Sequence, residues 1–263
     1  MEDKKNTFQR LLEVLDELRE KCPWDKVQTN ETLRTLTIEE TYELAESILE
    51  KDDEAISIEL GDLLLHIIFY AKIGEEKGTF DIGTVMEKLI DKLVYRHPHV
   101  FGDIKVQNAK EVEENWEKLK LKEKNGNKTV LSGVPKALPA MIKANRIQDK
   151  VRGVGFDWEE PSQVWDKVKE EFNELQLEIN KGNQDGIEDE FGDLFFSLIN
   201  TARLYGINPE NALERTNKKF INRFNYLEER TIQKGRNLKE MTLTEMDEIW
   251  EEAKKVLNSK KIN

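Results

Sequence analysis

The chain contains the same acidic pattern twice, at a fixed distance along the sequence. The pattern is E-E-x-x-E, then fifteen residues, then E-x-x-D. The first copy consists of Glu39, Glu40, Glu43, Glu59 and Asp62, and the second of Glu170, Glu171, Glu174, Glu190 and Asp193, each 131 residues later. Because about one residue in five is acidic, five matches at one chosen offset arise by chance roughly once in a few thousand trials. The pattern therefore indicates a duplicated unit that carries a cluster of carboxylates.

Apolar residues beside the second acidic pair repeat at the same offset. Leu60, Leu63, Leu64, Ile67, Ile68 and Ala71 are matched by Phe191, Leu194, Phe195, Leu198, Ile199 and Ala202. This spacing is typical of one face of a helix, and no segment shows a convincing alternating strand pattern. The sequence therefore predicts an all-α fold built from two helical units.

Composition narrows the class of protein. The net charge of −12 argues against a protein that coats a nucleic-acid polymer or an anionic membrane. The longest apolar run, from Leu63 to Ala71, is interrupted by His66 and is far shorter than a membrane span. The single cysteine, Cys22, excludes a disulfide within the chain and fits a reducing compartment. With no apolar signal-peptide core among the first residues, we expect a cytoplasmic protein.

Proline, glycine and asparagine divide the chain. We expect a first unit over 1–122, a linker over 123–139 that is rich in these residues, and a second unit over 140–263. Helices are expected over 7–21, 35–49, 53–76, 82–96 and 109–122, and then over 163–179, 184–205, 209–230 and 243–257. Asp52 or Asp53 is expected to cap the third of these, and His97 before Pro98 to end the fourth.

The acidic pattern favours a metal site. Acids three residues apart lie on one helix face, so Glu40 and Glu43 point together, as do Glu59 and Asp62. A turn between the two helices would bring four carboxylates into one pocket, where like charges repel unless a cation lies between them. Oxygen ligands suit Mg²⁺ or Mn²⁺. The alternative is a solvated helix face in a chain that is rich in charge.

Other metal sites fit the sequence poorly. A di-iron bundle requires Glu-x-x-His on two helices, and none of the three histidines lies three residues after a glutamate. Zinc sites use mainly cysteine and histidine ligands, and the chain has only one cysteine and three scattered histidines.

No glycine-rich phosphate loop is present, so side-chain cations and metal ions would have to hold a phosphate compound. Two spacings recur: Lys92 and Arg96 match Lys219 and Arg223, and Trp116 and Lys120 match Trp250 and Lys254. The basic pairs are either phosphate contacts or solvated helix faces. The tryptophans are either core residues or stacking surfaces for a base.

In order and spacing, these motifs resemble the MazG family of nucleoside triphosphate pyrophosphohydrolases. The resemblance runs from about Phe8 to Leu257. It rests on Cys22-Pro23-Trp24-Asp25, Gln28-Thr29, Glu39-Glu40-Thr41-Tyr42-Glu43, Glu59-Leu60-Gly61-Asp62 and Arg96-His97-Pro98-His99-Val100-Phe101 in the first unit, and on Gly155-Phe156-Asp157-Trp158, Lys169 to Glu174, Glu190-Phe191-Gly192-Asp193 and Lys218-Lys219-Phe220 in the second. The segment from Gly133 to Ala140 is similar to the family's inter-domain linker.

The resemblance implies a homodimer in which helices of two subunits complete each four-helix bundle, and a reaction that cuts a nucleoside triphosphate into a monophosphate and pyrophosphate. It implies Mg²⁺ ligands at Glu40, Glu43, Glu59 and Asp62 and at Glu171, Glu174, Glu190 and Asp193. Lys219 and Arg223 would contact phosphates, and Trp250, with Lys254 beside it, would lie by the base. In the family, the activity is generally assigned to the second unit.

Two points remain open at this stage. Beside the ligand Glu171, a spare carboxylate, Glu170 or Glu39, is expected to take the proton from the attacking water. The family often has a lysine just before the E-x-x-D acids, where this chain has Ile187, so a phosphate contact is either missing or supplied by Lys181. The alternatives to a broad pyrophosphohydrolase are a non-catalytic nucleotide-binding or protein-binding scaffold and an enzyme for one modified or alarmone nucleotide.

Overall fold

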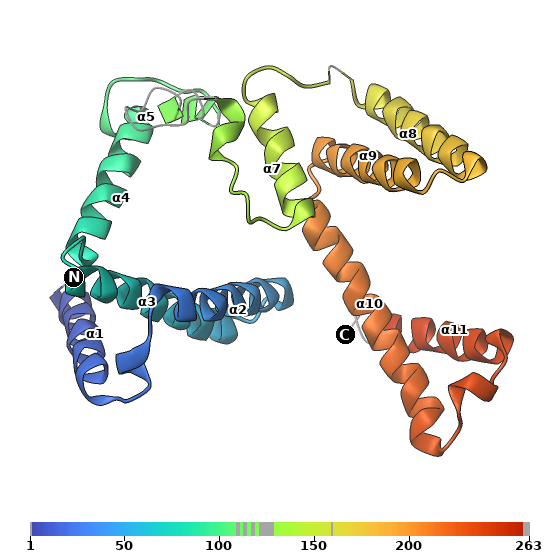
Figure 1. Ribbon diagram of the computed structural model, residues 1–263, viewed down its shortest axis with the longest axis horizontal. Helices are drawn as coiled ribbons and strands as arrows, with labels where there is room; N and C mark the ends of the chain where they lie inside the picture. The colour runs from blue at the N-terminus through green and yellow to red at the C-terminus, as the bar shows by residue number, and fades with distance from the viewer. Residues whose placement is uncertain are drawn as a thin grey trace. The chain divides into compact units, whose positions relative to one another are not determined.

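The computed structural model describes residues 2–108, 111, 112, 115, 116, 119, 120, 129–158 and 160–259. Within these residues the secondary structure is helical and contains no strand, which confirms the predicted all-α fold. The chain divides into two compact units, residues 1–116 and 117–263 (Figure 1). Among the described helices, none combines the length and the apolar character that crossing a membrane requires.

The first unit is built around a pair of long helices. Its elements are α1 (Glu2–Lys21), η1 (Asp25–Val27), α2 (Asn30–Glu50), α3 (Asp53–Glu76), α4 (Ile82–Arg96) and α5 (Pro98–Phe101). α2 and α3 pack along one another as an antiparallel hairpin, and α1 lies against α3. α4 touches α3 near the turn that joins them (Figure 1).

The second unit repeats the hairpin and adds another. Its elements are η2 (Val130–Gly133), α7 (Ala140–Arg152), α8 (Pro161–Lys181), α9 (Gln184–Leu204), α10 (Pro209–Arg230), η3 (Ile232–Lys234), η4 (Leu238–Glu240) and α11 (Leu243–Ser259). α8 and α9 form the counterpart of the α2–α3 hairpin, and α10 packs on α11. α7 lies against both α9 and α10.

Several helix ends agree with the sequence. α3, α4 and α10 begin and end where they were predicted, and His97 ends α4. α2 begins five residues early, because the Thr29 hydroxyl accepts a hydrogen bond from the Thr32 N–H while the Thr32 hydroxyl accepts one from the Thr29 N–H. No helix was predicted where α7 lies.

Two expected segments fall partly beyond the described residues. Of the helix expected over 109–122, only residues 111, 112, 115, 116, 119 and 120 are described, and they are helical. The linker expected over 123–139 is described from residue 129, where it contains η2.

Both carboxylate hairpins turn through a residue in the left-handed backbone conformation. Lys51, with φ 59°, ends α2, and Gly182, with φ 67°, ends α8 at the same place in the duplication. Asp52 then caps α3 by accepting hydrogen bonds from the N–H groups of Glu54 and Ala55. The turns therefore fix how the acidic faces of the paired helices meet.

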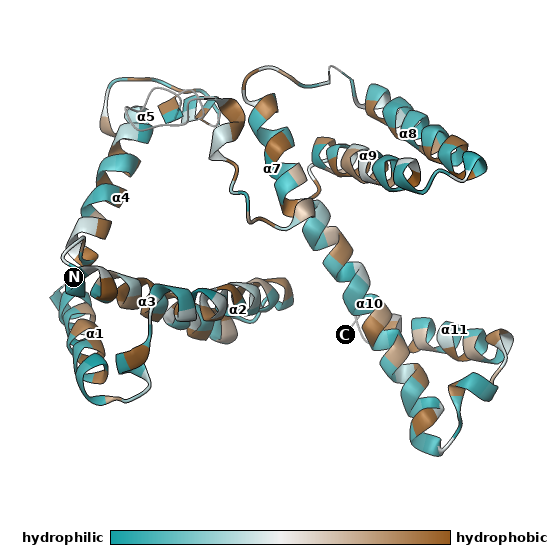
Figure 2. Ribbon diagram, viewed as in Figure 1, coloured by the Kyte–Doolittle hydropathy of each residue, from teal (hydrophilic) through white to brown (hydrophobic). Residues whose placement is uncertain are grey.

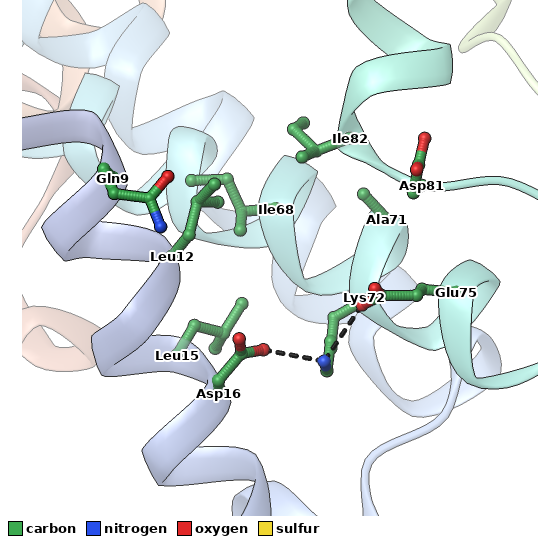
Figure 3. Close-up of a pocket in the computed structure, with 10 residues that line it drawn as sticks. All are labelled: Gln9, Leu12, Leu15, Asp16, Ile68, Ala71, Lys72, Glu75, Asp81 and Ile82. Atoms are coloured by element: carbon green, nitrogen blue, oxygen red, sulfur yellow. Dashed lines mark hydrogen bonds and ion pairs between the residues drawn. The ribbon is translucent and has the colours of Figure 1, made fainter. Parts of the chain in front are cut away.

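The core of the first unit lies where α1, α2 and α3 meet. Five side chains, each at most 3% exposed, form it: Leu15, Leu33, Ile68, Phe69 and Ile73. Beside them, a cavity of about 180 Å³ opens between α1, α3 and the start of α4 (Figure 3). The Lys72 ammonium lies 2.7 Å from a carboxylate oxygen of Asp16 and 2.9 Å from one of Glu75, so one ammonium bridges two carboxylates at the edge of the cavity (Figure 3).

α3 and α9 carry many hydrophobic residues (Figure 2), and several of these side chains are exposed. The repeated positions Ile68 and Ile199 are buried. Three other repeated positions are exposed in each unit: Leu60, Leu64 and Ile67 on α3 by 37–52%, and Phe191, Phe195 and Leu198 on α9 by 40–57%. Each hairpin therefore has one apolar face in contact with its own unit and another that is not covered.

Candidate metal and nucleotide site

α8 and α9 bring three carboxylates of the second unit together. Glu171 and Glu174 lie on one face of α8, and Glu190 lies opposite them on α9; one oxygen of each is within 4.8 Å of the others. The Glu171 residue is only 6% exposed. The Oε2 atom of Glu190 is buried and has no hydrogen-bond partner. An unsatisfied buried carboxylate oxygen is costly, and a cation between these groups would remove that cost.

The first unit has the matching arrangement. Glu40 and Glu43 on α2 and Glu59 on α3 place carboxylate oxygens within 4.8 Å of one another. Glu40 and Glu59 are half-buried, and Glu43 is exposed. The duplicated sequence pattern thus corresponds to a duplicated grouping of carboxylates from two helices.

The fourth expected acid of each unit lies beside the close group. Asp62 and Asp193 are not among the carboxylates that meet within 4.8 Å. Their negative charges nevertheless contribute to raising the pKa of Glu59 and of Glu190, respectively. Each unit therefore has three converging carboxylates with an aspartate at their margin.

Burial and like charges raise the pKa of carboxylates in both groups. For Glu190, burial has the largest effect on the pKa, followed by the charges of Glu174 and Asp193. For Glu40, burial again comes first, followed by Glu43 and then Asp62. A bound cation would reverse these effects by stabilising the ionised carboxylates. The donor atoms are all carboxylate oxygens, which fits Mg²⁺ or Mn²⁺ and does not fit zinc.

A lysine that the sequence reasoning missed contacts the second group. The Lys167 ammonium lies 2.7 Å from Oε1 of Glu171 and 2.9 Å from Oε1 of Glu170. These two hydrogen bonds raise the pKa of Lys167 well above its usual value. The signal was present in the sequence, because a lysine four residues before a glutamate lies on the same helix face. Glu170, the expected proton acceptor, is thus ion-paired and not part of the close group.

The proposed nucleotide contacts of the second unit gather on α10 and α11. The Arg223 guanidinium lies 5.9 Å from the centre of the Trp250 ring, and the Phe220 ring lies 5.0 Å from it. Lys219 lies one turn before Arg223 on α10. Lys254 lies one turn after Trp250 on α11 and forms an ion pair with Glu251.

The first unit has a similar cation–aromatic cluster. The Arg96 guanidinium lies 5.3 Å from the centre of the Trp116 ring, and the His97 ring lies 4.8 Å from it. His97 also lies 5.6 Å from the His99 ring. Lys92 lies one turn before Arg96 on α4, and Lys120 follows Trp116 in the sequence. In both units the arginine of the repeated basic pair therefore lies over the repeated tryptophan, a contact that the spacing did not predict.

Within the second unit, the carboxylates and the arginine–tryptophan pair belong to separate hairpins. α8 packs on α9, and α10 packs on α11. α9 and α10 have few contacts with each other and diverge from the turn that joins them (Figure 1). The Lys181 ammonium, the other candidate phosphate contact, lies 2.5 Å from Oε1 of Glu178. Among the described residues of the second unit, the expected metal ligands and the expected nucleotide contacts therefore do not lie on one packed surface.

The duplicated pairs of long helices, each with a group of carboxylates from both helices, define the class as an all-α protein of two tandem units. The chain belongs to the MazG family, because the model of the MazG nucleotide pyrophosphohydrolase domain matches residues 28–101 and 159–227. The two matches contain the two carboxylate groups, so the duplication is a tandem repeat of the family domain. The resemblance inferred from the sequence motifs is confirmed.

Curated relatives resemble most of the chain. The nucleoside triphosphate pyrophosphohydrolase/pyrophosphatase MazG of Thermotoga maritima is 42% identical, over 94% of this chain and 95% of the relative. The nucleoside triphosphate pyrophosphohydrolase of Escherichia coli is 38% identical, over 95% and 98%, respectively. The uncharacterized protein YabN of Bacillus subtilis is 46% identical, over 94% of this chain and 51% of YabN.

Proposed function

We propose that this chain hydrolyses nucleoside triphosphates to nucleoside monophosphates and pyrophosphate, with Mg²⁺ as the cofactor and Mn²⁺ as a substitute. The observation that carries the proposal is the convergence of three carboxylates in the second unit around a buried, unpartnered oxygen of Glu190. Two relatives that match nearly the whole chain are named nucleoside triphosphate pyrophosphohydrolases. The proposed role is broad maintenance of nucleotide pools in the cytoplasm, a reducing compartment that suits a single cysteine.

The second unit is the proposed catalytic unit. Its ligands are Glu171, Glu174, Glu190 and Asp193, and the matching set in the first unit is Glu40, Glu43, Glu59 and Asp62. The second group is favoured because it contains a buried glutamate, an unsatisfied oxygen and an adjacent lysine. When bound, Mg²⁺ supplies counter-charge to the triphosphate and lowers the pKa of a water molecule.

The remaining steps fall to side chains of the chain. The oxygen of a water molecule attacks the α-phosphorus, the bond from that phosphorus to the bridging oxygen breaks, and pyrophosphate leaves with the bridging oxygen. Glu170, next to the ligand Glu171 on α8, accepts the proton of the water. Lys219 and Arg223 hold the phosphates. Trp250 stacks on the base, a contact that every base can make, and Lys254 lies beside it.

A homodimer would complete the site. Apolar side chains on α9, such as Phe191 and Phe195, are exposed, and the described residues of the second unit do not cover them. The proposed ligands and nucleotide contacts lie on separate hairpins of one chain. We therefore propose that the carboxylates of one subunit face Arg223 and Trp250 of its partner.

The reaction is tested by pyrophosphate release from a panel of nucleoside triphosphates, with and without Mg²⁺. We expect release from several bases, dependence on the cation, and loss of release in Glu171→Ala. Release that persists in Glu40→Ala would assign the activity to the second unit. No release from any triphosphate, with nucleotide binding retained, would overturn the proposal in favour of a binding scaffold. A steep preference for one compound would contradict broad specificity.

The shared site is tested by mixing two inactive variants. Glu171→Ala and Arg223→Ala are unfolded and refolded together, so that random reassembly makes half of the dimers mixed. If each site uses Glu171 of one subunit and Arg223 of the other, every mixed dimer contains one intact site, and activity returns to about one quarter of the wild-type value. If both residues of a site come from one chain, no activity returns, and the proposed arrangement is wrong. Refolded wild-type protein is the control.

A further inference from the structure

Three polar side chains link α10 to α11: Tyr226, Arg230 and Glu252, called the Tyr226 network below. The Tyr226 hydroxyl donates a hydrogen bond of 2.6 Å to Oε1 of Glu252. The Arg230 guanidinium donates one of 2.7 Å to the Tyr226 hydroxyl and one of 2.9 Å to the same oxygen of Glu252. It also lies 5.0 Å from the centre of the Tyr226 ring. Each group therefore contacts the other two, and the network joins the two helices.

The network lies next to the arginine–tryptophan pair on both helices. Tyr226 is three residues after Arg223 on α10, which is about one helical turn. Glu252 is two residues after Trp250 on α11. A movement of α11 along or around α10 would therefore change both the network and the contact between Arg223 and Trp250.

The orientation of α11 depends on this contact with α10. Among the described helices, α10 is the only one that α11 contacts extensively (Figure 1). The buried residues beside the network are Leu227 on α10, which is 4% exposed, and Ala253 on α11, which is 0% exposed. The alanine side chain is small and fixes the orientation of a helix only weakly, whereas a satisfied polar network selects one arrangement.

The first unit does not repeat the network. At the same spacing from Arg96 and from the tryptophan of that unit, the sequence has His99, Asp103 and Lys118, so the linking tyrosine hydroxyl is missing. α4 also ends at Arg96, whereas α10 continues for about two turns beyond Arg223. The extra length of α10 supplies the tyrosine and the second arginine of the network.

We propose that the Tyr226 network positions Trp250 beside Arg223, so that the tryptophan ring can receive the base of a nucleotide. The inference rests on the proposed function, in which Trp250 stacks on the base. The carboxylate group belongs to α8 and α9, so the network affects nucleotide binding through Trp250 and leaves the chemical step unchanged. Its members are positioning residues, because they act through another side chain.

The size of the effect follows from the stacking contact. Loss of an aromatic ring that stacks on a base weakens binding on the order of tenfold or more. Tyr226→Phe keeps every ring in place and removes only the hydroxyl that links the other two groups. The Arg230 and Glu252 side chains are 43% and 48% exposed, so the ion pair that remains between them is weak. We expect α11 to lose part of its fixed orientation and nucleotide binding to weaken about threefold.

The test is the steady-state kinetics of pyrophosphate release from ATP by the full chain. Tyr226→Phe raises KM about threefold and leaves kcat unchanged, and Trp250→Ala raises KM about tenfold. The double variant has the KM of Trp250→Ala alone, because Tyr226 acts through Trp250 and the two effects do not add. Calorimetric binding of a non-hydrolysable ATP analogue shows the same order of affinities.

Arg236 provides a matched control for Arg230. Its guanidinium lies 3.3 Å from Oε1 of Glu245, so it is a second arginine paired with a glutamate of α11, and its side chain is 49% exposed. Arg230→Gln and Arg236→Gln remove the same charge from similar surroundings. We expect KM to rise in Arg230→Gln and to stay unchanged in Arg236→Gln. Circular dichroism shows whether both variants fold, and Tyr226→Phe decides the question if Arg230→Gln does not.

The outcomes separate this inference from the proposed function. Pyrophosphate release with an unchanged KM in Tyr226→Phe, an equal rise in Arg236→Gln, or additive effects in the double variant would overturn the inference and leave the reaction intact. An unchanged KM in Trp250→Ala would overturn both the inference and the proposed stacking of the base. No pyrophosphate release by the wild type would overturn the proposed function, and the inference with it.

Discussion

Gly182→Ala and Lys51→Gly should change stability in opposite directions. Each residue ends the first helix of a carboxylate hairpin, with φ 67° at Gly182 and 59° at Lys51. A residue with a side chain pays about 1–2 kcal/mol in this left-handed region, and glycine does not. A Cβ added at Gly182 meets no atom within 4 Å, so its cost is purely conformational.

The unfolded chain offsets part of this cost. Replacing glycine by alanine restricts the unfolded state and stabilises the fold by about 0.4–1 kcal/mol. The difference leaves Gly182→Ala destabilising by about 0.5–1 kcal/mol and Lys51→Gly stabilising by a similar amount. A change of this size shifts the melting temperature by a few degrees in a unit of this length.

Differential scanning calorimetry of the full chain measures both changes, and Gly182→Asn serves as a control. Asparagine tolerates the left-handed region better than alanine and should lose less stability. If the two main variants shift the melting temperature in the same direction, or if Gly182→Ala is as stable as the wild type, the backbone conformation is not what distinguishes the two turns.

Other perturbations test packing, charge and assembly. The Arg203 side chain is almost buried and donates hydrogen bonds to both carboxylate oxygens of Asp157. Arg203→Leu should therefore lower the free energy of unfolding by about 2 kcal/mol, as measured by urea unfolding. An unchanged midpoint of the urea transition would contradict this. The hydrogen bond from Arg19 holds the pKa of Glu76 below its ordinary value of 4.5. The pair therefore stabilises the fold at pH values above 4.5, and this contribution is lost as the pH falls through the lowered pKa. Glu76→Gln should lower the free energy of unfolding at neutral pH and have almost no effect on it in acid, as measured by chemical unfolding at both pH values. Phe195 is 57% exposed in the single chain, so Phe195→Asp should yield monomers in light scattering, and an intact dimer would refute the proposed apolar interface.

Spacing predicted the local part of the site well. Glu171 and Glu174 share a helix face because they lie three residues apart, and that relation holds in any α-helix. The early start of α2 at Thr29 was missed because its capping partner is a threonine in place of the more familiar glutamate or glutamine. Lys167 was missed although its spacing to Glu171 is equally local.

By itself, the sequence determined the duplication, the helical fold and the acidic face of each hairpin, because helix periodicity relates residues that are close along the chain. Only the tertiary structure decided that three of four carboxylates converge, that Arg223 meets Trp250, and that Arg203 binds Asp157. These contacts join residues far apart in sequence, and they depend on how whole helices pack against each other. That packing is a sum over many side chains, which no short motif records.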